Sequence, residues 1–119
     1  MRRNKLAAGL VVVAVGVGGV ATTVAPAAPA ATYKLSADKS KLKFNKTTIR
    51  AKAGKVTLSM SNPSPLPHNV GVQGKGTGKT VNKGGTSTFS VTLKKGTYTF
   101  YCGVGSHAKA GMKGKLIVS

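Results

Sequence analysis

Apolar and polar residues alternate with a period of two in most segments after residue 30, and this pattern restricts the fold more than any other feature. It is seen at 33–36, 41–44, 49–53, 56–60 and 88–93, where apolar residues alternate with lysine, arginine, serine or threonine. Successive side chains of a β-strand point to opposite faces of a sheet, so each segment is typical of a strand with one buried and one solvated face. No segment of useful length in this part of the chain has the 3.6-residue period of a helix. We therefore predict an all-β domain.

Turn-forming residues separate these segments. Glycine, proline or asparagine occurs at Gly54, in 62–67, in 83–85 and at Gly96. Such residues favour the tight turns that join short strands. Roughly seven to eight short strands with solvated outer faces predict two packed sheets, that is, a β-sandwich. Tyr98 is expected to form a corner contact that pins a strand crossing.

The first thirty residues are typical of a signal peptide. A basic stretch at 1–5 precedes an apolar run at 6–24, and the small residues at 28–30 suit cleavage. This order of segments marks proteins for export. We therefore predict a signal peptide at 1–30 and one domain at 31–119, located in the periplasm, outside the cell or at the cell envelope. Because the apolar run is long for a signal peptide, an uncleaved membrane anchor remains the alternative.

The mature domain is strongly cationic. The chain contains 19 basic residues and one acidic residue, Asp38, and only three of the basic residues, all within the first five positions, leave with the predicted signal peptide. The remaining 16 give the domain a net charge of +15. Such a field attracts anionic surfaces and acidic partners. The basic residues are spread from Lys34 to Lys115 and do not cluster beside aromatic residues, which argues against nucleic acid as the ligand.

The chain has a single cysteine, Cys102. Exported proteins normally use cysteines in pairs as disulfides, so a lone thiol indicates another role, such as binding a metal or a partner thiol. Taken alone, Cys102 is equally compatible with a small buried apolar residue.

Cys102 belongs to a group of residues with metal-binding side chains. His107 and Met112 follow it within eleven residues, and the other histidine of the chain, His68, lies far upstream. Soft sulfur ligands favour Cu(I) and imidazole suits Cu(II), so this set suits copper that changes its oxidation state. Zinc is the alternative ion, but methionine is a poor zinc ligand.

The alternation of side chains independently supports convergence of these residues. Cys102 falls on the same face of its strand as Phe100. His68 is in line with the two valines that follow it, and Met112 is in line with the apolar residues of the last strand. Three of the four side chains are therefore expected to point inward at strand ends, whereas His107 lies in the loop between two strands.

Two motifs together resemble the cupredoxins, and plastocyanin-like and azurin-like blue copper proteins are the branch that they resemble most. The first motif is His68-Asn69, which an apolar strand reaches through Asn62 and a proline-containing segment. The second is Tyr-Cys-x4-His-x4-Met-x-Gly at 101–114. The resemblance covers most of the mature chain and implies a Greek-key β-sandwich that binds one type 1 copper ion.

The resemblance also implies roles for individual residues. Three strong copper ligands and one long axial ligand are expected, in this order: His68, Cys102, His107 and Met112. Asn69 is expected to hold the two ligand loops together and to donate its backbone N–H to the sulfur of Cys102. The exposed edge of His107 is the expected exit for electrons, inside a small apolar patch.

An electron carrier is therefore the expected function, and an enzyme is not. Copper oxidases and nitrite reductases of this superfamily need further histidines for additional copper centres, and this chain has two histidines in all. We expect a monomer that carries single electrons between extracytoplasmic redox partners. Its lysines would steer an acidic partner or hold the protein near an anionic cell envelope. Two alternatives stay open, namely a copper storage or delivery protein and a cationic envelope-binding module with a vestigial site.

Overall fold

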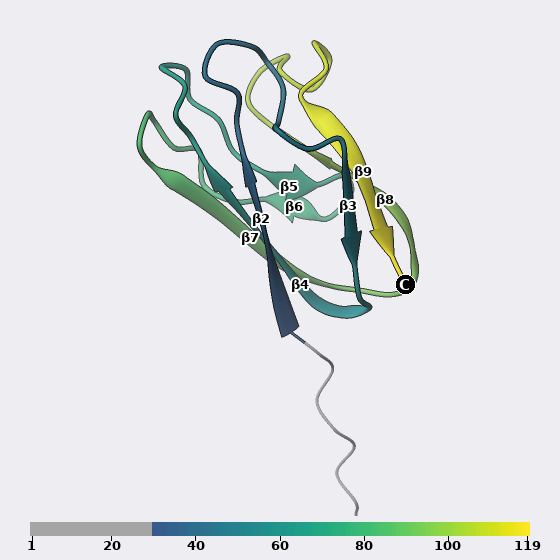
Figure 1. The fold of residues 1–119 in the computed structure, drawn as a ribbon. Coiled ribbons are helices and arrows are strands. Elements are labelled where there is room, and N and C mark those ends of the chain that lie inside the picture. Colours follow the sequence, from purple (N-terminus) through teal and green to yellow (C-terminus); the bar gives the residue numbers. More distant parts are fainter. Residues whose placement is uncertain (1–29) are drawn as a thin grey trace, which may run out of the picture.

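The computed structural model describes residues 30–119, which form strands joined by turns and loops (Figure 1). The eight strands are β2 (Ala30–Ser36), β3 (Thr48–Ala51), β4 (Gly54–Ser61), β5 (Gly71–Val72), β6 (Gly76–Thr77), β7 (Thr86–Leu93), β8 (Gly96–Tyr101) and β9 (Lys113–Val118). The prediction of an all-β sandwich is confirmed. No described segment forms a helix long and apolar enough to cross a membrane. Apart from Ala30, the predicted signal peptide lies outside the described residues.

The strands form two sheets. The three-stranded sheet has the order β2-β4-β7, and the five-stranded sheet has the order β3-β9-β8-β5-β6. Two strand pairs are parallel, β2 with β4 and β3 with β9, and the other pairs are antiparallel. Ala30 pairs with Lys55 at the end of the sandwich that also holds the C-terminus. The loop between β8 and β9 lies at the opposite end (Figure 1).

The core lies between the two sheets and follows the alternation of the sequence. On β4, Val56, Leu58 and Met60 are fully buried, whereas the residues between them are half-buried. Across the core, the rings of Phe44 and Phe100 pack with their centroids 5.5 Å apart. Complete burial of one such side chain contributes about 1.5–3 kcal/mol to stability. Apolar burial from both sheets therefore holds the sandwich together.

The predicted strand at 41–44 is not formed. The carboxylate of Asp38 accepts hydrogen bonds from the backbone N–H groups of Ser40 at 3.0 Å and Lys41 at 2.8 Å. These bonds lower the pKa of the Asp38 carboxyl and fold the segment into bends. Only one isolated bridge, made by Phe44, remains of the expected strand. Side-chain capping of the backbone has replaced sheet pairing here, although Phe44 is buried as predicted.

The predicted corner contact of Tyr98 is present. The hydroxyl of Tyr98 donates a hydrogen bond to the carbonyl of Lys94 at 2.8 Å, across the turn that joins β7 to β8. Because β7 and β8 belong to different sheets, this bond ties the crossing between the sheets to the start of β8.

Gly114 allows the ring of Phe100 to pack directly against the backbone of β9. A Cβ atom at position 114 would overlap this ring and would lie 2.7 Å from the carbonyl oxygen of Thr47. The neighbouring strands therefore leave no room for a side chain at this position.

We predict that Gly114→Ala lowers the free energy of unfolding by about 1–3 kcal/mol, because Phe100 or the backbone must move. Urea denaturation of the purified domain measures the change. The matched control is Lys115→Ala at the next, exposed position, which should change the free energy by less than about 0.5 kcal/mol. Equal stability of the two variants would contradict the described packing of Phe100.

Candidate metal centre

Three side chains with metal-binding atoms converge at the end of the sandwich that carries the β8–β9 loop. The Sγ atom of Cys102 lies 3.9 Å from Nδ1 of His68 and 3.6 Å from Nδ1 of His107. The two Nδ1 atoms are 3.2 Å apart, and all three atoms lie within 4.8 Å of one another. Among residues 30–119, this is the one group of three or more His, Cys, Asp or Glu side chains with such spacing. The structure thus brings together three of the four predicted site residues.

The three side chains differ in burial. Cys102 and His68 are fully buried, whereas His107 is half-buried. The two imidazole rings are tilted by 58°, with their centroids 5.0 Å apart. An ion held between the three atoms would be shielded from water by the sandwich, and His107 would provide the link to the surface.

Hydrogen bonds between its own backbone groups hold the segment between β8 and β9 in a compact loop. The N–H of Cys102 donates to the carbonyl of Met112 at 3.1 Å, and the N–H of Met112 donates to the carbonyl of His107 at 3.0 Å. A further bond runs from the N–H of His107 to the carbonyl of Val104 at 3.0 Å. Met112 is fully buried. The fourth predicted residue therefore lies beside Cys102 and His107.

His68 is held by segments distant from the β8–β9 loop. It forms an isolated antiparallel bridge with Val81, in which each N–H donates to the other's carbonyl, at 3.1 and 2.8 Å. The buried side-chain amide of Asn62 donates to the carbonyls of Leu66 and Val81, both at 2.9 Å. The support from Val81 could not be predicted from the sequence, because no local pattern connects this residue with His68.

Asn69 joins the two segments that carry the converging side chains. Its backbone N–H donates to the Sγ of Cys102 at 3.5 Å, and its side-chain oxygen accepts from the N–H of Gly103 at 2.6 Å. Its side-chain amide donates to the hydroxyl of Thr80 at 3.1 Å. One residue thus connects His68, the start of the β8–β9 loop and the segment before β7. The contact with Thr80 could not be predicted from the sequence, because no local pattern connects this residue with Asn69.

Protonation of His68 is unfavourable in the folded domain. Burial lowers the pKa of its imidazole below the ordinary value of 6.5, and the neighbouring His107 lowers this pKa further. The Nε2 atom of His68 is buried and has no hydrogen-bond partner among the described residues. A neutral imidazole is the form that binds a metal. His68 is therefore suited to offer its Nδ1 atom to a cation at neutral pH.

The donor atoms fit a soft or borderline cation. No carboxylate belongs to the group, so calcium and magnesium, which require oxygen ligands, do not fit. Two imidazole nitrogens and one sulfur lie within 4.8 Å of one another, a spacing at which one cation can contact all three atoms. Thiolate, imidazole and thioether are ligands that suit copper.

Comparison with known proteins agrees with this chemistry. Residues 10–118 match the family described as the cupredoxin-like domain. This match covers more than half of the chain and includes all four predicted site residues.

Several solved structures have a similar fold. Dithionite-reduced auracyanin from Roseiflexus castenholzii is 22% identical, with a TM-score of 0.68 over 76% of this chain and 99% of that protein. Auracyanin A, a blue copper protein from Chloroflexus aurantiacus, is also 22% identical, with a TM-score of 0.68 over 76% of this chain and 100% of that protein. A blue copper oxidase from Nitrosomonas europaea is 21% identical, with a TM-score of 0.61 over 74% of this chain but 38% of the oxidase. At these identities the likeness shows the fold.

We predict that the stability of the metal-free domain falls as the pH drops below about 6.5, because unfolded His68 gains a proton there before folded His68 does. The contribution of His68 to the free energy of unfolding is complete above the pKa of His68 in the unfolded chain. It is lost progressively as the pH falls toward the lower pKa of His68 in the folded domain. Urea denaturation at a series of pH values measures the slope. The variant His68→Asn should show a smaller slope in this range, and a slope unchanged by this substitution would contradict the assignment.

We also predict that Asn69→Ala lowers the free energy of unfolding by about 1–3 kcal/mol, because the N–H of Gly103 and the hydroxyl of Thr80 lose their partner. The matched control is Thr80→Val, which removes only one of these bonds and should cost less than about 1 kcal/mol. Chemical denaturation of the metal-free forms compares the two. If both variants were equally stable, the bond to Gly103 would not tie the segments together.

Proposed function

This chain belongs to the cupredoxin-like family, and from this membership we propose that it binds one copper ion and carries single electrons outside the cytoplasm. The observation that carries the proposal is the convergence of the Sγ of Cys102 with the Nδ1 atoms of His68 and His107 within 4.8 Å. Copper bound there supplies a one-electron couple between Cu(I) and Cu(II).

Four residues would hold the ion. The thiolate of Cys102 and the Nδ1 atoms of His68 and His107 would be the strong ligands, and the thioether of Met112 would be a weak one. Support for Met112 comes from its complete burial and from its backbone hydrogen bonds to Cys102 and His107.

The surroundings of the proposed ligands favour fast electron transfer. The N–H of Asn69 points at the Cys102 sulfur, where a hydrogen bond withdraws electron density and tunes the redox potential. The bridge between His68 and Val81 and the closed β8–β9 loop hold the ligands in place. Ligands that hardly move between two oxidation states keep the cost of reorganisation low.

His107 is the proposed exit for the electron, because it is half-buried while Cys102 and His68 are fully buried. Leu66 is 46% exposed and is the one large apolar side chain so exposed among the described residues. The proposed apolar docking patch around His107 consists of Pro65, Leu66, Pro67, Val104, Ala108 and Ala110. A small apolar patch of this kind suits the brief docking of a redox partner.

Charge and the N-terminal segment complete the proposal. A domain with 16 basic residues and one acidic residue would attract a redox partner that is acidic at its docking surface, and it would also associate with an anionic cell envelope. Residues 1–30 are the proposed signal peptide, and they would place a monomeric carrier in the periplasm or outside the cell.

The burial of the site favours electron carriage over copper storage or delivery. A protein that hands over its metal needs ligands that a partner can reach, whereas Cys102 and Met112 are fully buried. Catalysis is not part of the proposal, because the chain has two histidines and both are assigned to the one proposed copper centre. A cationic envelope-binding module with a vestigial site would not require three converging donor atoms.

Titration of the metal-free domain with Cu(II), followed by visible absorption, tests the proposal. One equivalent of copper should produce an intense thiolate-to-copper charge-transfer band, which a reductant bleaches and an oxidant restores. Cys102→Ser should abolish the band, because an alcohol does not replace a thiolate as a soft ligand. The matched control in the same loop is the exposed position Ser106, where Ser106→Ala should leave the band intact.

The other outcomes are equally informative. Copper binding without the band, or a band that survives Cys102→Ser, would overturn the proposed ligand set. A band that does not return after reduction and reoxidation would favour copper storage or delivery over electron carriage.

A further inference from the structure

The outer face of the five-stranded sheet contains a hollow of about 750 Å³, separate from the converging Cys and His side chains. It is lined by residues of β8 and β9, by the start of the β5–β6 turn and by part of the β8–β9 loop. β8 is paired with β9 along its whole length and with β5 at Phe100 and Tyr101. A ligand in the hollow would meet the outward-pointing side chains of both strands.

Three lysines line the hollow, and no acidic residue does. Lys113 and Lys115 lie two residues apart on β9 and so point to the same face, while Lys109 comes from the β8–β9 loop. The one acidic residue among residues 30–119, Asp38, accepts hydrogen bonds within its own turn. The positive charge of the hollow is therefore uncompensated within the described domain, which favours an anionic ligand.

The rest of the lining suits a ring that carries hydroxyl groups. Tyr101 presents an aromatic side chain on the face opposite to its buried neighbours Phe100 and Cys102. Thr97 and Thr99, at the same parity on β8, offer hydroxyls. An aromatic face, hydroxyls and nearby ammonium groups match the apolar face, the hydroxyls and the carboxylates of an acidic sugar.

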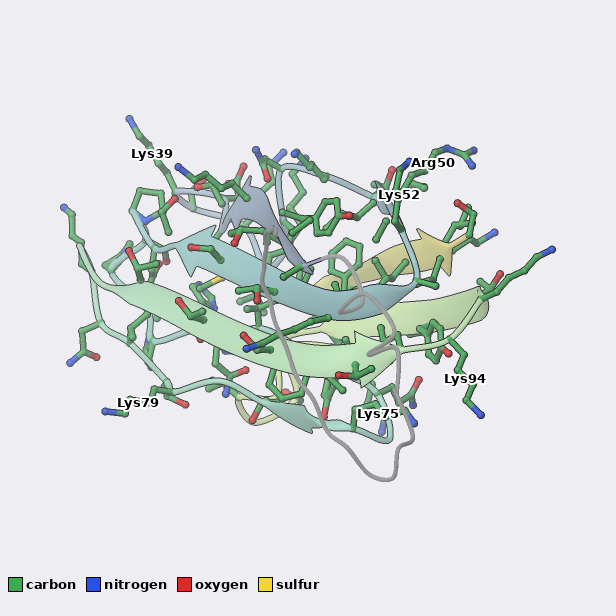
Figure 2. All side chains as sticks on the ribbon, turned by 90° about the horizontal axis from the view of Figure 1, so that it is seen from below. Lys39, Arg50, Lys52, Lys75, Lys79 and Lys94 are labelled. Atoms are coloured by element: carbon green, nitrogen blue, oxygen red, sulfur yellow. The ribbon has the colours of Figure 1, made fainter. Side chains whose placement is uncertain are left out.

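Positive charge also continues beyond the hollow around the whole sandwich. Figure 2 shows basic side chains that project from several different sides of the domain, labelled Lys39, Arg50, Lys52, Lys75, Lys79 and Lys94. A rigid folded partner or a flat membrane contacts one face at a time. A flexible anionic polymer can contact several faces at once, so it matches this distribution of charge better.

We propose that this hollow binds a segment of an acidic polysaccharide, with lysines 109, 113 and 115 pairing with its carboxylates and Tyr101 stacking on a sugar ring. The surrounding cations add sequence-independent attraction along the polymer. This inference goes beyond electron carriage and requires no copper. Its failure and the failure of the proposed function are therefore distinguishable.

Binding of polygalacturonate to the full domain tests the proposal, with uncharged dextran and length-matched polyphosphate and polyglutamate as comparison polymers. Two triple variants remove equal charge: lysines 109, 113 and 115 to glutamine in the hollow, and lysines 39, 52 and 79 to glutamine outside it. The hollow variant should bind polygalacturonate at least about tenfold more weakly than the control variant. Copper-loaded and metal-free protein should give the same ratio. Thermal unfolding confirms that both variants are folded.

The variant Tyr101→Leu separates recognition of the sugar from attraction by charge. It should weaken binding of polygalacturonate by about tenfold, because a leucine cannot stack on a ring, and should leave the affinity for polyphosphate unchanged. Equal losses in the two triple variants would overturn the proposal and leave only diffuse charge. Tighter binding of polyphosphate or polyglutamate than of polygalacturonate, with the same dependence on the three lysines, would also overturn it and identify a different anion.

Discussion

Strand β8 lies between β5 and β9, and its hydrogen bonds to both strands set the geometry of the site. Tyr101 pairs with Gly71 on one side and with Lys113 on the other, so Cys102 follows at the point where β8 ends and where β5 and β9 begin. A register slip of one residue would turn Cys102 to the outer face. The packing of Phe100 against Gly114 opposes such a slip, because a residue with a Cβ atom opposite Phe100 would overlap its ring. The same strand therefore carries both the inner site and the outer hollow.

The sequence alone could predict the parts of the structure that depend on local alternation. Because strand parity is a property of neighbouring residues, the inward positions of His68 and Cys102 followed from the apolar residues around them. The predicted strand at 41–44 failed, since its alternation matches that of a strand but the Asp38 carboxylate bonds to the backbone instead. The bridge from His68 to Val81 could not be predicted from the sequence either, because pairing between distant segments depends on how the sheets assemble.

The domain tolerates a large excess of positive charge because its stability comes from elsewhere. Apolar side chains from both sheets form one continuous core, and most lysines project into water at the surface. Dispersed like charges still repel one another and oppose compaction. Anions that bind the folded domain would relieve this repulsion and stabilise the fold by mass action. The basic surface therefore links the stability of the domain to its ionic surroundings.

The position of Ala30, where β2 begins, determines which end of the domain is free to meet a partner. β2 begins at the end of the sandwich that holds the C-terminus, and His107 lies in the loop at the opposite end. The chain therefore enters the domain at the pole farthest from the proposed electron exit. Any support attached before residue 30 would hold the domain by this end and leave the end with the proposed electron exit free to meet a partner.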